Sequence, residues 1–594
     1  ALWDAANRVP AAASRNIFTY DPTLAVRNRG RGFLWAQLNS TQTAALNKDG
    51  AGVTDGLGAT RLAWLRGDRT NEGEATGNFR KRSATTVLGD IVNSDPAFAG
   101  NQDYGFSRLA GSEGSSYTTF RASSSYLNRP PMLYVGANDG MLHGFRVSNG
   151  DELMAYVPNA VFSGLSQLTA QTYNANHRYL VDGSVRVLDA RVDNAWRTVL
   201  LGTLGGGGKG VFALDVSDPA SFGTSHVLWE FTPTSDADVG YSYPQASIAR
   251  MAHGKWVALI GNGYNSTAGK AVLYVVDLDN GSIIRKFDTN VAGDNGMSSP
   301  IPVDINGDRI TDLIYAGDLK GNLWKIDVRD ANAANWAFDF GTASVPLPLF
   351  TACSAATCTS TNRQTITARP EVGISPDGGY LIYVGTGSYF AATDNTAGTV
   401  GNSFYGIVDR DDGSTRPSGR SSLLQQSLIA EVQRDFGSRT EKVRVTTNNA
   451  RTASDLGWYL DLPSLGERQV STPILRGGAV IFTTLIPNTA ACGFGGDSFL
   501  MEIDAVSGSR RTTTPFDLNR DTAFNSEDEV VIGGVSYVVS GRQSKEGIIK
   551  TPAIIAAGAF EVKLASGTTG GIDTTIEPPP GVEPGGRLSW RQMR

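Results

Sequence analysis

The sequence predicts an all-β protein, a β-propeller of about seven irregular four-stranded blades with inserted loops and one or two short helices. Three observations carry this prediction. A pattern recurs about every sixty residues, 69 glycines lie among the 594 residues, and a proline or glycine opens each unit of the repeat. Short strands separated by such turn residues are typical of propeller blades.

Each unit of the repeat has an apolar strand that ends in glycine, then a turn, then a second strand that ends near a polar turn. The glycines that end the first of these strands are Gly136, Gly202, Gly261, Gly317 and Gly385, and residues 480–508 form a weaker copy. The units open at Asp95-Pro96, Asp182-Gly183, Tyr243-Pro244, Ser299-Pro300, Arg369-Pro370, Thr472-Pro473 and Thr551-Pro552. Proline is tolerated at the first residue of a strand, so these positions indicate where successive blades begin.

We divide the chain into three parts. Residues 1–87 are predicted to be strands and loops that complete the last blade or pack on the side of the propeller. Residues 88–567 form the propeller, and residues 568–594 form a Pro/Gly-rich, solvated tail. The longest insertion lies between Gly413 and Ser471, and the apolar residues from Leu423 to Val432 within it have helical spacing, which predicts one short amphipathic helix.

Composition excludes several classes of function. A net charge of −6 argues against a nucleic-acid partner that is held by bulk positive charge. No apolar run reaches the length of a membrane span. The chain opens Ala1-Leu2-Trp3-Asp4 without a signal peptide, so we infer a fragment or processed product whose targeting segment lies upstream. A disulfide between Cys353 and Cys358 fits an oxidising compartment, and two unpaired thiols are the alternative.

The most informative segment is residues 304–312, named loop A here. Asp304, Asn306, Asp308 and Asp312 stand at positions 1, 3, 5 and 9 of a calcium-binding loop, and Ile310 at position 7 offers its backbone carbonyl. Three carboxylates within nine residues would repel each other without a cation. The flanking residues are strand-forming, so we predict a calcium loop within a β-sheet. A polar turn is the alternative, since Asp, Asn and Gly favour turns.

Two other segments have related spacing. In loop B, residues 47–55, the oxygen-bearing side chains are Asn47, Asp49 and Asp55, while Val53 is placed to offer a carbonyl. Ala51 stands at position 5 without a side-chain oxygen, so a Gly-rich turn is the simpler account by spacing alone.

In loop C, residues 517–528, the side chains at positions 1, 3, 5, 9 and 12 are Asp517, Asn519, Asp521, Asn525 and Asp528. Position 6 is Thr522 instead of the glycine that allows a sharp turn, so a metal site and an acidic surface loop are both open.

The remaining motifs give weaker evidence for a functional site. Arg66-Gly67-Asp68 is an integrin-type tripeptide, but its charged surroundings would equally form internal ion pairs. The run from Gly205 to Gly210 lacks a Ser or Thr after its lysine and a following helix, which excludes a phosphate loop. The four histidines do not stand at zinc-ligand spacing, and no nucleophile elbow is present. We therefore predict no catalytic residues.

Three phrases resemble a known family. Residues 88–96 (LGDIVNSDP), residues 134–143 (YVGANDGMLH) and residues 304–326 occur in the order in which the PilC/PilY family of type IV pilus tip proteins has them. The resemblance extends from Leu65 to Trp590, corresponds to that family's C-terminal β-propeller domain, and is strongest to the pseudomonad PilY branch.

The resemblance implies a pilus-associated protein at the cell surface that is exported through the periplasm. Such proteins support pilus assembly, oppose retraction, support twitching motility and attach to host cells. It implies calcium at Asp304, Asn306, Asp308, Ile310 and Asp312, and a second calcium loop at Asn47, Asp49, Ala51, Val53 and Asp55. It implies minor pilins and the pilus machinery as partners, together with a host integrin or another surface receptor at Arg66, Gly67 and Asp68.

Two rival functions remain open from the sequence. Quinone-dependent dehydrogenases also have propeller repeats of strands and glycine turns, but they often carry an adjacent cysteine pair, whereas four residues separate Cys353 from Cys358. A glycan- or integrin-binding module that uses one face of the propeller is the third reading.

Overall fold

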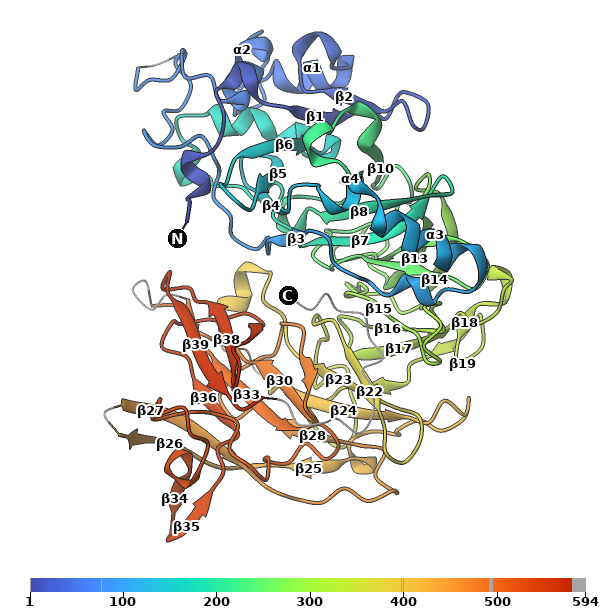
Figure 1. Cartoon of the computed structure of the whole chain (residues 1–594), viewed down its shortest axis with the longest axis vertical. Helices are drawn as coiled ribbons and strands as arrows, with labels where there is room; N and C mark the ends of the chain where they lie inside the picture. The colour runs from blue at the N-terminus through green and yellow to red at the C-terminus, as the bar shows by residue number, and fades with distance from the viewer. Residues whose placement is uncertain are drawn as a thin grey trace. The chain divides into compact units, whose positions relative to one another are not determined.

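The computed structural model describes residues 2–75, 77–396, 398, 400–437, 439–490 and 495–579. The chain divides into two compact units. Unit 1 consists of Ala1–Met297, Asn306–Thr311 and Arg329–Asn335. Unit 2 consists of Ser298–Ile305, Asp312–Val328 and Trp336–Arg594. Strands dominate both units (Figure 1).

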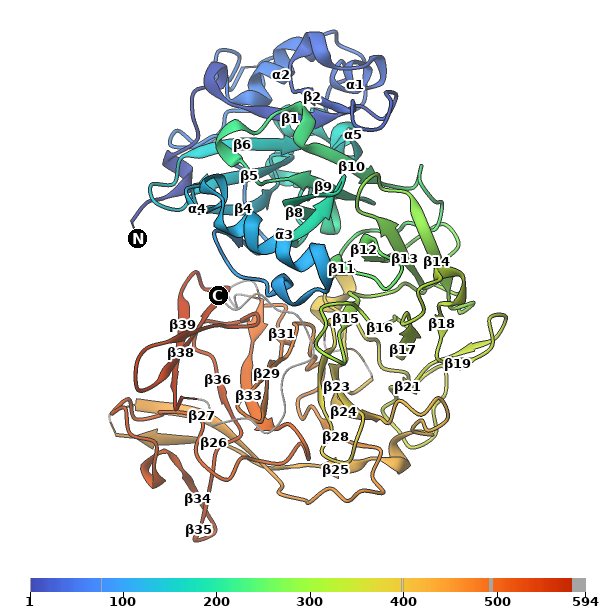
Figure 2. The ribbon, with the colours of Figure 1, turned by 45° about the vertical axis from the view of Figure 1, so that its right-hand side comes forward.

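Unit 1 contains three sheets. The first has the order β2-β1-β6-β5-β4-β3, with β1 (Ile17–Tyr20), β2 (Gly30–Gly32), β3 (Ala97–Ala99), β4 (Met132–Ala137), β5 (Met141–Arg146) and β6 (Glu152–Val157). The second has the order β10-β9-β8-β7, with β7 (Val185–Val192), β8 (Ala195–Thr203), β9 (Val211–Asp215) and β10 (Val227–Phe231). The third has the order β11-β12-β13-β14, with β11 (Ser247–Arg250), β12 (Trp256–Gly261), β13 (Val272–Asp277) and β14 (Ile283–Asp288) (Figure 2).

Unit 2 contains four larger sheets. One joins β15 (Ile301–Val303), β16 (Leu313–Gly317), β17 (Asn322–Asp327) and β18 (Ala337–Phe338), and β21 (Phe350–Thr351) also pairs with β17. The next has the order β22 (Glu371–Ile374), β23 (Tyr380–Gly385), β24 (Ser403–Asp409), β28 (Gly457–Asp461) and β25 (Leu424–Gln426). A six-stranded sheet has the order β26 (Leu428–Phe436), β27 (Arg439–Thr446), β36 (Gly541–Gln543), β33 (Phe499–Asp504), β30 (Ala479–Thr483) and β29 (Ile474–Arg476). The last has the order β37 (Ala553–Ala556), β38 (Glu561–Ser566) and β39 (Ile572–Glu577).

Three hairpins complete the strands of unit 2. They are β19 (Phe340–Gly341) with β20 (Pro346–Leu347), β31 (Ile486–Pro487) with β32 (Gly496–Asp497), and β34 (Val530–Ile532) with β35 (Val535–Tyr537). Among the described residues there are thus seven sheets of three or more strands, and most are antiparallel meanders. This agrees with the predicted blades.

The glycines of the repeat lie at close approaches. Each of the five ends or nearly ends a strand, namely β4, β8, β12, β16 or β23. A Cβ atom on Gly136 would meet the carbonyl oxygen of Val181, and one on Gly317 would meet the side chain of Ile366. Glycine recurs there because the neighbouring chain leaves no room for a side chain.

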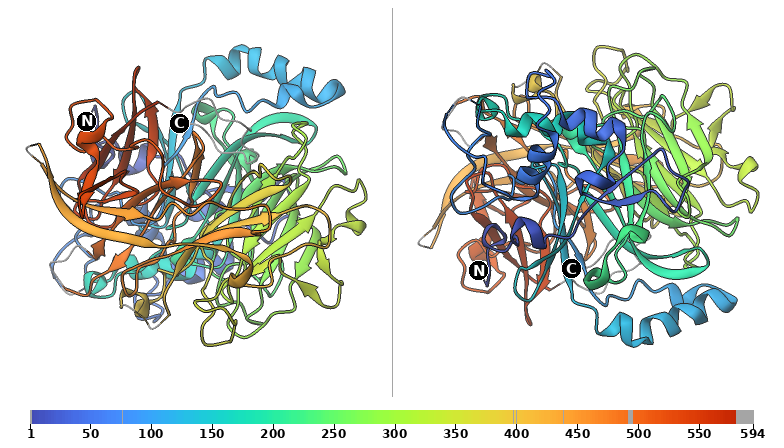
Figure 3. Two further views of the ribbon diagram at one scale, coloured as in Figure 1. Left: turned by 90° about the horizontal axis from the view of Figure 1, so that it is seen from below. Right: turned by 90° about the horizontal axis from the view of Figure 1, so that it is seen from above.

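Five α-helices lie among the described residues, against the one or two that the sequence predicted. They are α1 (Ser40–Leu46), α2 (Gly58–Arg66), α3 (Gly111–Ala122), α4 (Ser124–Leu127) and α5 (Phe162–Leu165). The helical segment α3–α4 lies on the outside of the sheets of unit 1 (Figure 3). Tyr117 and Tyr126 anchor it, because both hydroxyls donate to the buried carboxylate of Asp189 on β7, at 3.0 and 2.8 Å.

The helix predicted from Leu423 to Val432 is wrong. This segment forms β25 and the beginning of β26, and β26 pairs antiparallel with β27 from Leu428↔Thr446 onward. Spacing in a short apolar run does not separate helix from strand, and here the pairing with a later strand decides the conformation.

The two ends of the chain add strands to sheets. Strand β1 pairs parallel with β6, so the N-terminal strands extend the first sheet; of the two arrangements predicted for residues 1–87, this pairing is compatible with packing on the propeller and not with completion of the last blade. The C-terminal tail differs from prediction. Within the predicted tail, Ile572–Glu577 forms β39, which pairs with β38 along its whole length. The β-branched residues of β39 suit a strand. Residues 580–594 lie outside the described part of the chain.

Candidate metal-binding loops

Loop A connects β15 to β16 and turns sharply at two positions. Gly307 and Arg309, at positions 4 and 6, have φ values of 83° and 73°. Position 6 of such loops is normally glycine because the chain turns sharply there. Arginine rarely adopts a positive φ, so the turn is imposed on this residue by the loop around it.

The side-chain oxygens of loop A accept hydrogen bonds from the loop's own backbone. Asn306 Oδ1 accepts from the N–H of Asp308 at 2.9 Å, and Asp308 Oδ1 accepts from the N–H of Ile310 at 2.8 Å. Asp312 Oδ2 accepts from the N–H of Ile305 at 2.8 Å. Each carboxylate has further lone pairs, so these contacts fix its orientation without using all its acceptor capacity.

Burial separates the ends of loop A from its centre. Asp304 and Asp312 are each 7% exposed, whereas Asn306 and Asp308 are exposed. Tyr315, at position 12, is fully buried, and its hydroxyl donates to Asp409 Oδ2 at 2.5 Å. This hydroxyl is therefore not placed to act as a metal ligand of loop A. In the described residues no three His, Cys, Asp or Glu side chains converge as a metal-holding group. Asn306 and backbone carbonyls would therefore have to contribute.

Loop B follows α1, and its side-chain oxygens are already engaged by neighbouring groups of the protein. Asp49 Oδ1 accepts from the N–H groups of Ala51 and Val53 at 2.9 and 2.8 Å, and Asn47 Oδ1 accepts from the N–H of Gly58 at 2.9 Å. Arg61 Nη2 lies 2.6 Å from Asp55 Oδ2.

The charge of Asp55 in loop B is therefore already compensated. Burial acts to raise the pKa of Asp55, but the Arg61 guanidinium outweighs it and lowers that pKa. A cation at this loop would have to compete with Arg61, and the donor set fits calcium less well than that of loop A.

Loop C shows the turn that its sequence did not indicate. Arg520 and Thr522, at positions 4 and 6, have φ values of 63° and 66°, as Gly307 and Arg309 do in loop A. Asp517 accepts from the N–H groups of Asp521 at 3.1 Å and Thr522 at 2.9 Å. The absence of glycine at position 6 therefore does not prevent the loop geometry.

Asp528 closes loop C from inside the protein. Its side chain is fully buried, and its Oδ1 accepts from the N–H of Leu518 at 2.7 Å. Burial, together with the charge of Asp517, raises the pKa of Asp528 above its ordinary value, although backbone hydrogen bonds act in the opposite direction. Two buried carboxylates near each other favour either a proton or a cation at this loop.

The tripeptide Arg66-Gly67-Asp68 forms the end of α2, and its arginine is turned inward. The Arg66 guanidinium donates to the backbone carbonyls of Phe33 at 3.1 Å, Ala12 at 3.0 Å and Arg15 at 2.9 Å. The side chain is only 9% exposed, and burial lowers its pKa.

The other two residues of the tripeptide close the helix. Gly67 has a φ of 118°, which suits the residue after a helix. Asp68 Oδ1 accepts from the N–H and the hydroxyl of Thr70 at 2.7 and 2.6 Å, which lowers the pKa of Asp68. Through Arg66, the tripeptide thus binds the N-terminal segment of unit 1 by hydrogen bonds to its backbone.

Cys353 and Cys358 form the disulfide that we favoured over free thiols. Cys492 lies outside the described residues. No described helix has the length and apolar composition needed to cross a membrane.

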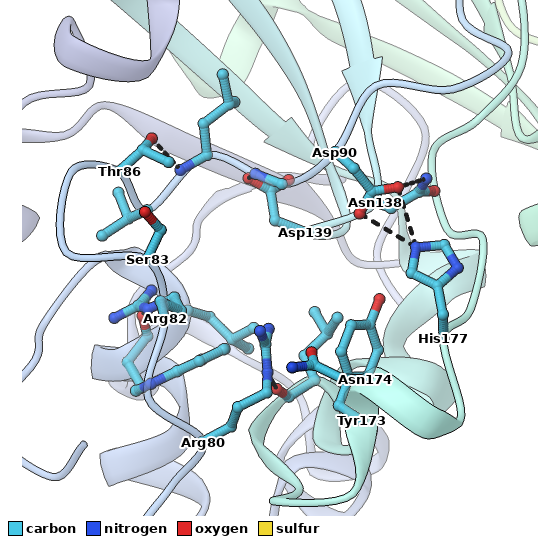
Figure 4. A pocket seen from close by; sticks show the side chains of 16 residues that line it. Arg80, Arg82, Ser83, Thr86, Asp90, Asn138, Asp139, Tyr173, Asn174 and His177 are labelled. Carbon is cyan, nitrogen blue, oxygen red and sulfur yellow. Dashed lines mark hydrogen bonds and ion pairs between the residues drawn. The ribbon is translucent and has the colours of Figure 1, made fainter. Parts of the chain in front are cut away.

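The sequence analysis missed a polar pocket in unit 1, of about 230 Å³ (Figure 4). Arg80 and Asn174 lie on one side of it and Asp90 and Asp139 on the other, while the rings of Tyr173 and His177 lie next to each other, with centres 5.6 Å apart. Two acidic residues of the pocket, Asp90 and Asp139, lie in the segments 88–96 and 134–143. These segments revealed the family resemblance, and their acidic residues could also have indicated a binding site.

A buried ion cluster lies behind this pocket. His143 Nδ1 is 2.7 Å from Glu152 Oε1 and its Nε2 is 3.2 Å from Asp139 Oδ1, while Arg15 also pairs with Glu152 at 2.7 Å. Burial alone would lower the pKa of His143, but the two carboxylates raise it to about 9. Asp139 therefore faces the pocket with its charge compensated.

Comparisons with known proteins agree with one another. The family model described as the PilY1 beta-propeller domain matches residues 88–441. The type IV pilus biogenesis factor PilY1 of Pseudomonas aeruginosa (strain PAK) is 37% identical over an alignment that covers 94% of this chain and 50% of that protein. A PilY1 homolog of Xylella fastidiosa (strain Temecula1) is 35% identical over 90% of this chain and 39% of that protein.

A solved structure supports the same similarity. The crystal structure of the Pseudomonas aeruginosa PilY1 C-terminal domain matches with a TM-score of 0.65 and 33% identity, and covers 78% of this chain and 95% of that chain. This chain spans half the length of the P. aeruginosa relative.

Proposed function

We propose, on the premise that this chain belongs to the PilY1 β-propeller family, that it acts in type IV pilus biogenesis as a calcium-dependent protein of the pilus. Membership of the family confirms the predicted fold and the predicted resemblance. The relatives described above are named as pilus biogenesis factors and not as enzymes, so the quinone-dependent dehydrogenase is not pursued.

The observation that carries the calcium dependence is the backbone of loop A. Its positive φ values at positions 4 and 6 and its inward-facing ends match a loop that wraps a hard cation. Asp304, Asp308 and Asp312 would have to draw together around the ion to supply carboxylate oxygens, since no three acidic side chains converge among the described residues. Asn306 would supply an amide oxygen and Ile310 a carbonyl. A bound calcium ion would neutralise the three carboxylates and so remove their mutual repulsion.

Loop C is the next candidate and loop B the weakest. Loop C has five oxygen-bearing side chains and the same backbone turn, whereas in loop B the carboxylate of Asp55 is paired with Arg61. Extracellular calcium modules bind in the range of about 10⁻⁴–10⁻³ M, so ambient calcium would set the occupancy of such loops.

We further propose that ordered loops present a surface to minor pilins and the pilus machinery. Loss of calcium would loosen loop A, weaken that contact and let the pilus retract more freely, which would change twitching motility. On this proposal the protein acts at the pilus on the cell surface.

The test is calcium titration by calorimetry of the wild-type chain and of Asp308→Ala. One binding event should be lost or weakened at least about tenfold, because a direct carboxylate ligand is removed. Asp412→Ala is the matched control, since Asp412 is an exposed aspartate in a similar turn outside the three loops. An isotherm unchanged by Asp308→Ala would exclude loop A as a calcium site.

The same variants separate the site from the regulation. Twitching of cells that carry Asp308→Ala in the full-length protein should lose its response to calcium, and Asp412→Ala should keep it. A calcium site that disappears while twitching still responds to calcium would remove the regulatory part of the proposal and leave the site.

Attachment to integrin through Arg66, Gly67 and Asp68 stays a prediction, and the geometry does not favour it. A receptor would have to withdraw Arg66 from three carbonyl groups. Binding of purified integrin by Asp68→Ala tests it most cleanly, because Asp68 contributes little to the buried contacts.

A further inference from the structure

The pocket of Figure 4 contains an arginine, Arg80, whose two terminal nitrogens have no ion-pair partner among the described residues. Arg80 Nε donates to the carbonyl of Leu168 at 3.0 Å, and its Cζ lies 4.5 Å from the ring centre of Tyr173 and 5.5 Å from that of Trp64. No described residue forms an ion pair or hydrogen bond with its Nη1 or Nη2. Its neighbour Arg82, by contrast, is paired with Glu72.

Partial burial of Arg80 without an ion partner is costly. Burial lowers the pKa of Arg80, while the charges of Tyr173, Glu72 and Asp90 act in the opposite direction. The Arg80 guanidinium lies over the Tyr173 ring, and its two terminal nitrogens form the planar fork that can bind a carboxylate through both oxygens. The pocket therefore suits a ligand that carries a carboxylate.

A second polar group in the pocket lacks a partner. Trp64 lines the pocket and is 3% exposed, and its indole Nε1–H makes no hydrogen bond with any described residue. Buried donors without partners are rare because each costs free energy. This nitrogen is covered by the protein, so a ligand in the pocket does not reach it without a shift of the lining.

The opposite wall of the pocket consists of acceptors. Asp90 is held by His177 Nε2 at 3.0 Å and by Asn138 Nδ2 at 2.8 Å, and Asp139 by the N–H of Gly89 at 3.0 Å. An ionised carboxylate only accepts hydrogen bonds, so the ligand must also bring donors to this wall.

Hydroxyl groups fit this wall better than a second cation. His143 already compensates the charge of Asp139, and Asp90 already accepts from two side chains. The volume of about 230 Å³ is below that of sites for drug-sized ligands and suits a single sugar ring.

We propose that this pocket binds an acidic sugar, with the ligand carboxylate on Arg80 and the ligand hydroxyls on Asp90 and Asp139. The proposal does not depend on the calcium loops, because none of their residues lines the pocket.

The first test compares three ligands by calorimetry with the wild-type chain at a fixed calcium concentration. D-Glucuronate should bind at least about tenfold more tightly than D-glucose, which lacks the carboxylate. L-Glutamate, which carries carboxylates and an ammonium group but no hydroxyls, should also bind more weakly than glucuronate. Equal binding of glucose, equal or tighter binding of glutamate, or no binding of glucuronate at millimolar concentration would overturn the proposal.

The second test uses variants. Arg80→Met should abolish the preference for glucuronate over glucose, and Arg80→Lys should keep part of it, because a lysine keeps the charge without the planar fork. Arg121→Gln is the control, since Arg121 is a partly exposed arginine of unit 1 that pairs with Asp103 away from the pocket. Circular dichroism checks that each variant is folded. A folded Arg80→Met that keeps the preference would overturn the proposal, and the ligand comparison decides the question if that variant does not fold.

Discussion

Replacing Arg66 with alanine should destabilise unit 1 by about 3 kcal/mol. The guanidinium donates to three backbone carbonyls, at 3.1, 3.0 and 2.9 Å, and the side chain is 9% exposed. A buried acceptor that loses its donor costs about 1–3 kcal/mol. Three such acceptors, taken at the lower end of that range because water can reach part of the site, give about 3 kcal/mol.

The assay is urea unfolding followed by circular dichroism, with hydrogen exchange measured on peptides from residues 10–20 and 30–38. The urea midpoint should fall by about 1 M or more. Exchange should rise in both peptides, because the carbonyls of Ala12, Arg15 and Phe33 lie in these segments. Asp68→Ala is the matched control, which removes only a local turn contact and should change stability by less than about 1 kcal/mol.

Two results would refute this reasoning. An unchanged midpoint with unchanged exchange would show that Arg66 does not hold the N-terminal segment. Loss of integrin binding in Arg66→Ala at unchanged stability would show that the guanidinium is displayed to solvent instead.

Two further predictions concern pH. The pKa of His143 is raised from 6.5 to about 9 beside Asp139 and Glu152, with Arg15 also facing the cluster, so up to about 3 kcal/mol of stability is present below pH 6.5 and is lost as the pH rises through 9. Urea midpoints between pH 6 and pH 9.5 should show this loss, and His143→Gln should not; a parallel decline in both would contradict it. In calcium-free buffer the raised pKa of Asp528 should make stability fall as the pH rises above 3.8 toward that raised pKa. Asp528→Asn should remove this dependence, and an unaltered slope of midpoint against pH in that variant would count against the role given to Asp528.

The repeat pattern predicted the sheets because its physical cause is local. Gly136 and Gly317 are glycine since the neighbouring chain leaves no space for a Cβ atom, and this constraint recurs at the same place in successive blades. The partner of the N-terminal strand β1 was not predicted, because it lies more than a hundred residues away and no local pattern reports such a pairing. The C-terminal strand β39 was missed although its partner β38 directly precedes it.

The candidate sites divide in the same way. Ligand spacing could single out loop A and loop C from the sequence, since the residues of each loop lie close together along the chain, and calcium binding at both stays a prediction. The inward turn of Arg66 and the pairing of Asp55 with Arg61 depend on tertiary packing, so no local pattern in the sequence reported them. The pocket around Arg80 combines residues from 64 to 177, which only the fold brings together.

The parallel pairing of β1 with β6 has a consequence for handling the protein. Residues Ile17–Thr19 cover the outer backbone edge of Ala155–Val157, and the short β2 then caps that addition. In a shortened chain that begins after residue 32, β6 would be an exposed and largely apolar edge strand. Such an edge can pair with a strand of a second molecule. Such a truncation should self-associate even though every other blade is intact.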